Sequence, residues 1–134
     1  MSGGWALQQA LYGALTGDAG VAALVSTRIF DDVPREAALP YIVIGEDEES
    51  DWSTATESGS EHSLTLHVWS RAAGYKEIKQ ICDAVRGALD GAALPVSGFY
   101  LIDLRFENTR TARQNDGRTY HAIMRFRAVL EPQE

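Results

Sequence analysis

The C-terminal segment RTYHAIMRFRAVL, residues 118–130, alternates between apolar and polar positions along its length. The even-numbered positions from 120 to 130 are apolar, whereas His121, Arg125 and Arg127 occupy odd positions. Because successive side chains of a strand point to opposite faces, this pattern predicts a long strand with one buried and one polar face. The rest of the chain must therefore supply an apolar layer that covers one face of a sheet.

Two parts of the chain have the helical periodicity needed for such a layer. In residues 5–15, Leu7, Leu11 and Leu15 recur at every fourth position, which predicts an amphipathic helix with a narrow apolar stripe. Gly17 ends it, and Asp18 is placed to cap a second short helix. A longer helix is predicted within residues 74–91, with one continuous apolar face formed by Ile78, Ile81, Cys82, Val85 and Leu89.

The remaining strands are expected at residues 28–30, 41–46, 63–70 and 99–107. The second and third of these are neighbours in the sequence, so we expect them to pair as a hairpin. In the fourth, Tyr100, Ile102, Leu104 and Phe106 are expected to share one face. The order of elements predicts a single α+β domain spanning residues 1–134. It would contain a mainly antiparallel sheet of about four to five strands with helices packed on one face.

Composition narrows the class of protein. The single cysteine cannot form an intramolecular disulfide, and no apolar run approaches the ~20 residues of a membrane span. The N-terminus lacks the features of a signal peptide, so we expect no membrane association. A formal net charge of −7 disfavours a general nucleic-acid binder. The charge is segregated, because residues 36–70 contain eight acids and no Lys or Arg, whereas residues 71–130 contain ten bases and six acids.

The most unusual segment is EDEESDWSTATESGSE, residues 46–61, which has seven carboxylates and no Lys or Arg. A calcium site is disfavoured because the central glycine and the closing glutamate of a calcium loop are missing. A domain linker is disfavoured because the flanking strands are expected to pair. We therefore predict a long, mobile acidic hairpin loop in which Trp52 anchors a partner. The candidate assembly or lumen residues of this loop are Glu46, Asp47, Glu48, Glu49, Asp51, Trp52, Glu57 and Glu61.

Groups able to perform catalysis are not gathered in an evident pattern. Cys82 lies within an apolar helical stripe, where a thiol stays protonated. His62 and His67 are an odd number of residues apart on one strand, so they are expected on opposite faces. His121 is expected at the surface. The sequence predicts no enzyme and no catalytic, cofactor-binding or metal-binding residues.

Three segments resemble, in order and spacing, the tail completion or tail terminator family of long-tailed phages and gene transfer agents. They are LQQALYGALTGDAGVAALVSTRIFDDVP, LPYIVIGEDEESDWST and HSLTLHVWSRAAGYKEIKQICDAVRGAL. The most specific parts are residues 28–34, the Pro40-Tyr41 strand start and the Val68–Arg71 strand end that leads to Gly74. The resemblance covers about residues 7–131, with a weaker match in the C-terminal third.

The resemblance implies a structural virion protein without catalytic residues. Members of the family form a ring, typically a hexamer, on the head-proximal end of the tail tube. The ring stops tube elongation, contacts the tail tube protein and the head connector or stopper, and lets DNA pass through its hole. A non-enzymatic adaptor or assembly chaperone of another complex is the alternative. Besides the acidic loop, the candidate interface residues are Trp69, which is either core or an intersubunit anchor, and the basic pair Arg125 and Arg127.

Overall fold

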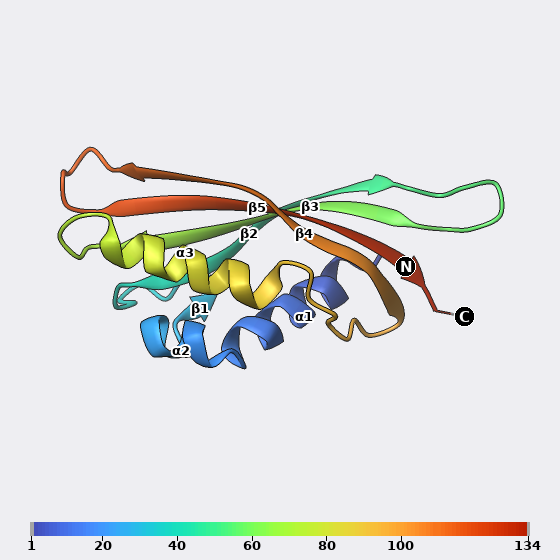
Figure 1. Ribbon diagram of the computed structural model, residues 1–134, viewed down its shortest axis with the longest axis horizontal. Helices are drawn as coiled ribbons and strands as arrows, with labels where there is room; N and C mark the ends of the chain where they lie inside the picture. The colour runs from blue at the N-terminus through green and yellow to red at the C-terminus, as the bar shows by residue number, and fades with distance from the viewer. Residues whose placement is uncertain (1, 134) are drawn as a thin grey trace.

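The computed structural model describes residues 2–133 as three helices and five strands (Figure 1). None of the helices in this part of the chain is long and apolar enough to cross a membrane. In chain order the elements are α1 (Gly4–Thr16), α2 (Ala19–Val25), β1 (Ile29–Phe30), β2 (Tyr41–Asp51), β3 (Ser60–Ser70), α3 (Lys76–Leu89), β4 (Phe99–Arg113) and β5 (Tyr120–Pro132).

The strands form one open sheet in the order β1-β2-β3-β5-β4. Every neighbouring pair is antiparallel except β1 and β2, which are parallel. All three helices lie on the same face of this sheet, and within the described residues no element covers the opposite face (Figure 1). The α+β class and the one-sided helical layer expected from the sequence are confirmed.

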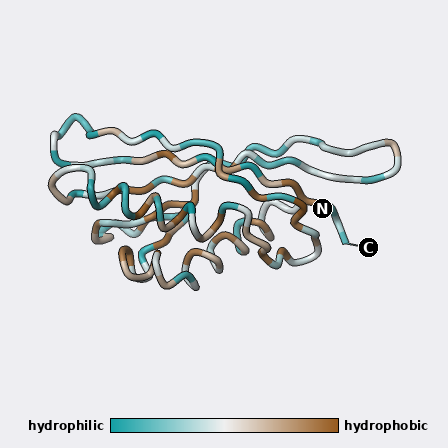
Figure 2. The backbone as a smooth tube through the Cα atoms, in the orientation of Figure 1, coloured by the Kyte–Doolittle hydropathy of each residue, from teal (hydrophilic) through white to brown (hydrophobic). Residues whose placement is uncertain are grey.

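The core lies between the helical layer and the sheet. Leu7, Leu11 and Leu15 of α1 are buried, as the four-residue spacing predicts. The side chain of Asp18 accepts a hydrogen bond from the backbone N–H of Val21 and so caps α2. The predicted apolar face of α3 is buried as a whole and comprises Ile78, Ile81, Cys82, Val85 and Leu89. In Figure 2 the hydrophobic segments gather in the body of the molecule, where helices and sheet meet.

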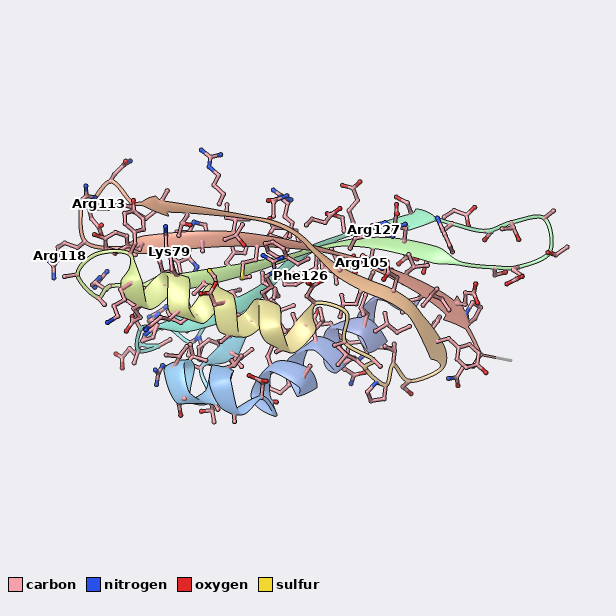
Figure 3. All side chains as sticks on the ribbon, in the orientation of Figure 1. Lys79, Arg105, Arg113, Arg118, Phe126 and Arg127 are labelled. Atoms are coloured by element: carbon pink, nitrogen blue, oxygen red, sulfur yellow. The ribbon has the colours of Figure 1, made fainter. Side chains whose placement is uncertain are left out.

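The alternating strand β5 supplies the centre of the sheet side of this core. Its residues Tyr120, Ala122, Met124, Phe126, Ala128 and Leu130 are all buried, as predicted. The ring of Phe126, labelled in Figure 3, meets the ring of Phe106 edge-on at 5.6 Å between centroids. β5 lies between β3 and β4 and pairs with both. Its pairing with β3 has no register shift, so the alternation of buried and outward side chains continues along the strand.

The prediction for the buried face of β4 was wrong in its first half. Tyr100 and Ile102 are 57% and 49% exposed, whereas Leu104 is buried. The pairing of β4 with β5 shifts register between Leu101 and Asp103, which inserts one extra residue in β4. An extra residue reverses the inward and outward sides of the strand, so Leu101 replaces Ile102 against the core.

The prediction of a long acidic loop was also wrong. Residues 46–51 continue β2, residues 60 and 61 begin β3, and the connecting loop is residues 52–59. The two strands pair without interruption from Asp47↔Leu64 to Asp51↔Ser60. Backbone hydrogen bonds form this ladder, and exposed carboxylates can extend from it into water without burial. The hairpin itself is confirmed and projects beyond the helical layer (Figure 1).

Candidate functional site

The projecting part of the β2–β3 hairpin, residues 46–61, is named the acidic arm below. A register shift between Ile44 and Asp47 places an extra residue in β2 at the base of the arm. Gly45 is required here, because a Cβ at this position would lie 2.8 Å from Cδ2 of His67. Beyond the shift, Asp47 and Glu49 pair with the inward residues Leu64 and His62, whereas Glu48 pairs with the outward Ser63.

The carboxylates at the base of the arm are tied to the body of the protein. The His62 side chain is fully buried, and its Nδ1 lies 3.2 Å from the carboxylate of Asp47. Its Nε2 lies 3.0 Å from Oγ of Ser60. Because a carboxylate only accepts, Nδ1–H of His62 donates to Asp47. Glu49 accepts a hydrogen bond of 2.6 Å from the hydroxyl of Ser2. The base of the arm is therefore hydrogen-bonded to the body of the protein.

The tip of the arm is a hydrogen-bonded turn. The backbone N–H of Trp52 donates to the carbonyl of Gly59 at 2.9 Å, and that of Thr54 donates to the carbonyl of Glu57 at 2.8 Å. The hydroxyl of Ser53 donates to Asp51 at 2.6 Å. The side chain of Trp52 is 45% exposed at the end of this projection. The arm thus presents an indole and several carboxylates to solvent on a two-stranded support.

A row of stacked rings crosses the uncovered face of the sheet. The Trp69 and His121 rings are parallel, with centroids 3.8 Å apart, and Nε2 of His121 lies 2.8 Å from Nδ1 of His67. Nε2 of His67 lies 2.7 Å from Oε1 of Glu46. Since the carboxylate must accept, His67 donates to Glu46 through Nε2–H, and its Nδ1 shares a second hydrogen bond with Nε2 of His121.

The charges of these groups follow from their contacts. The hydrogen bond from His67 holds the pKa of the Glu46 carboxyl below its ordinary value. Burial, and secondarily the neighbouring His67, lowers the pKa of His121. His121 was predicted only to lie at the surface, and its partners were not predicted because they are set by the register between strands. The pairing Trp69↔His121 and His67↔Ile123 brings the three rings together.

The two arginines singled out in β5 have different surroundings. Arg127 is half-buried, forms an ion pair with Glu61, and lies 3.5 Å from Asp103 (Arg127 and Arg105 are labelled in Figure 3). Arg125 is exposed, and no ion pair to it occurs within residues 2–133. Arg125 is therefore the one of the pair whose charge is directed to solvent.

The chemistry available in residues 2–133 is limited. Burial raises the pKa of the Cys82 thiol to about 12, so the thiolate needed for nucleophilic attack does not form at neutral pH. No group of three or more His, Cys, Asp or Glu side chains in this part of the chain has a geometry that could hold a metal ion. His62 and His67 occupy opposite faces, as their spacing predicts.

Comparison with protein families gives a match over nearly the whole chain. The model of the family described as tail completion protein gp17 matches residues 9–131. The chain belongs to the tail completion protein gp17 family. The family resemblance expected from the sequence is thereby confirmed.

Two relatives of this tail completion protein support the assignment. The tail completion protein gp17 of Bacillus phage SPP1 is 25% identical over 96 residues, which make up 72% of this chain and 71% of that protein. A chain in the structure of the virion of a native gene transfer agent particle superposes with a TM-score of 0.91 at 34% identity. That superposition covers 97% of this chain and 98% of the other. The chain is therefore a structural tail protein of a virion with a role in tail completion.

The structure brings the candidate residues of this tail completion protein into two groups and leaves the others separate. Glu46 and Trp69 belong to the row of rings, and Glu61 and Arg127 form one ion pair. Asp47 contacts His62, and Glu49 contacts Ser2. The remaining candidates are exposed to solvent and comprise Glu48, Asp51, Trp52, Glu57 and Arg125.

Proposed function

We propose that this chain forms a ring, of six copies, on the head-proximal end of the tail tube. The ring stops the addition of tail tube protein and joins the tail to the head connector or stopper. It is added during particle assembly in the bacterial cytoplasm. The observation that carries the proposal is the agreement over 97% of the chain with a subunit of a gene transfer agent virion, together with the family match.

The open sheet supports ring formation. A cyclic ring joins two different surfaces of each copy, and the two edges of this sheet are different surfaces. The segregation of charge along the chain gives these surfaces opposite character. Arg125 and Trp69 on the uncovered sheet face are further candidates for contacts with a neighbouring copy or with the tube.

The acidic composition supports passage of DNA through the ring. A net charge of −7 on each copy repels phosphates and disfavours retention of the duplex as it moves through the hole. In this proposal DNA is a transient occupant, and carboxylates of the acidic arm face the passage.

Deletion of the gene in the cells that produce the particle tests the proposal. The ring accounts for both tube length and head joining, so electron micrographs should show abnormally long tubes without heads, beside heads without tails. Supplying the wild-type gene in trans should restore joined particles of normal tail length. Tails of normal length joined to heads in the deletion strain would refute the proposed function.

A further inference from the structure

Both edges of the sheet leave long stretches of backbone without a strand partner. β1 is two residues long and pairs with Ile42 and Val43 of β2. Within residues 2–133, residues 44–51 of β2 have no strand on that side, and β4 pairs on one side only, with β5. Unpaired edges of this length are templates for another strand unless charges or bulges prevent it.

The two free edges carry opposite charge. Residues 46–51 of β2 contain five carboxylates and no base. Residues 108–113 of β4, named the basic segment below, contain Arg110 and Arg113 and no acid. Both arginines are exposed and form no ion pair within residues 2–133. Figure 3 shows Arg113 at the end of the β4–β5 hairpin, which Figure 1 places at the opposite end of the molecule from the acidic arm.

This arrangement selects which edges can meet. Two β2 edges repel each other, as do two basic segments, but a β2 edge and a β4 edge attract. Contacts between unlike edges are heterologous, which is the type of interface that generates a ring when the rotation closes. Three successive antiparallel pairings separate β2 from β4, so these strands are antiparallel within one copy. A neighbour related by rotation about an axis near the strand direction therefore offers β4 to β2 in the antiparallel sense.

We propose that the free edge of β4 in one copy pairs, antiparallel, with residues 44–51 of β2 in the next copy. This inference rests on the proposed ring and specifies its subunit contact. Within one copy Thr109 lies at the level of Ile44, through the register Ile44↔Leu66, Leu66↔Met124 and Thr109↔Met124. Bringing the basic segment alongside the acidic residues of β2 thus requires a displacement along the strands. When a sheet closes on itself, neighbouring strands are displaced along their length in this way, and the strands are therefore tilted relative to the axis of the ring.

The same alignment places a second pair of opposite charges together. In the antiparallel sense the chain beyond Arg113 runs toward β1 of the neighbour. The β4–β5 turn, with the exposed Arg118, then reaches the groove beside β1, which is lined by Asp31 and Asp32. The exposed rings of Trp5 and Tyr12 line this groove as well and offer apolar surface to the turn.

A charge exchange tests the contact. One variant carries Arg110→Glu and Arg113→Glu, which makes both of its edges acidic. The other carries Glu48→Arg, Glu49→Arg and Asp51→Arg, so that three arginines outnumber the two carboxylates that remain in residues 46–51 and its β2 edge becomes basic. Matched reversals on the solvent side of α3, Lys76→Glu and Asp83→Arg, serve as controls. All of the substituted side chains are exposed, and thermal melts verify that each variant is folded. If an edge variant fails to fold, the single reversals Arg113→Glu and Glu48→Arg take its place, and each alone should lower the number of joined particles because it weakens the attraction between the edges.

Each variant is supplied to the deletion strain alone and then together with the other, and joined particles are counted. We expect either edge variant alone to reduce joined particles to the level of the deletion strain, because like edges repel. The two together should restore joined particles, since each edge of one variant then meets an edge of opposite charge on the other. Control variants should act as wild type.

Two results would overturn this contact. Normal particles with either edge variant alone would show that the edges do not meet. Failure of the two variants to rescue each other would show that the edges contact different proteins, such as the tube or the connector. Neither result resembles failure of the proposed function, which would appear as normal particles in the deletion strain itself.

Discussion

The indole of Trp69 and the imidazole of His121 are parallel to within 3°, with centroids 3.8 Å apart, on the sheet face that no helix covers. The stack is continued by hydrogen bonds from His121 through His67 to Glu46, the first carboxylate of the acidic arm. The base of the arm is thereby connected to β5 across β3. Trp69 has an intrachain partner, and its half-exposed edge still leaves it available for the intersubunit contact proposed above.

The lowered pKa of His121 predicts a loss of stability at mildly acidic pH. The folded protein holds His121 neutral, whereas the unfolded chain protonates it as the pH falls below about 6.5. The unfolded state then binds more protons, so the free energy of unfolding decreases with falling pH in this range. The variant His121→Phe should retain the stack on Trp69 and show a smaller decrease between about pH 7 and pH 5. Thermal melts at several pH values in this range measure the loss of stability for both proteins. Equal pH dependence in the two would show that His121 does not cause the loss.

Ile81 of α3 is expected to be a principal core contact. Its side chain is fully buried between α3 and the sheet. Ile81→Ala should lower the free energy of unfolding by about 2–5 kcal/mol through lost burial and a residual cavity. Ile102→Ala, at a half-exposed bulge position, is the matched control and should change it by less than about 1 kcal/mol. Urea unfolding compares the two, and equal effects would contradict the placement of the core.

Gly45 should tolerate no side chain, although it lies in a strand. A Cβ there would approach the ring of His67 to 2.8 Å and disturb the hydrogen bond to Glu46. Gly45→Ala should therefore lower the melting temperature. Gly87→Ala in α3 is the opposite case: a Cβ at Gly87 meets no atom within 4 Å. There the higher helix propensity of alanine should stabilise the protein by about 0.5–1 kcal/mol. A melting temperature unchanged by Gly45→Ala would show that the bulge is not constrained.

The elements and the inward faces of the helices follow from local pattern. The four-residue spacing of Leu7, Leu11 and Leu15 and the alternation of β5 each have one arrangement that buries the apolar side chains, and the structure has that arrangement. Register shifts do not follow from local pattern, because one extra residue moves the following side chains to the other face of the sheet without any change in composition. The side assigned to Ile102 was therefore wrong.

Less of the candidate site than of the fold could be predicted from the sequence. The acidic composition of residues 46–51 suggested a loop, but strand pairing depends on backbone hydrogen bonds with β3, which composition does not report. The row formed by Trp69, His121 and His67 depends on the register between β3 and β5, which links residues more than fifty positions apart in the chain. No local pattern in the sequence specifies such a register.

The tip of the acidic arm should be dispensable for folding but required for tail completion. Because Asp51 pairs with Ser60, replacing residues 52–59 by an Asn-Gly turn preserves the register of both strands and the contacts of His62. We expect a melting temperature close to that of the parent and fewer joined particles in the complemented deletion strain. Trp52→Ala separates the role of the indole from that of the turn. Normal numbers of joined particles with the shortened arm would show that the tip makes no essential contact.

The most direct test of the account is a reconstruction of the head-proximal end of the tail by cryo-electron microscopy, without imposed symmetry. We predict density for six copies of this chain in a closed ring between the last ring of tube subunits and the head connector. The acidic arms should point toward the passage, and β4 of each copy should lie beside β2 of the next. Density for this chain at another position in the particle, or as a single copy beside the tube, would contradict the account.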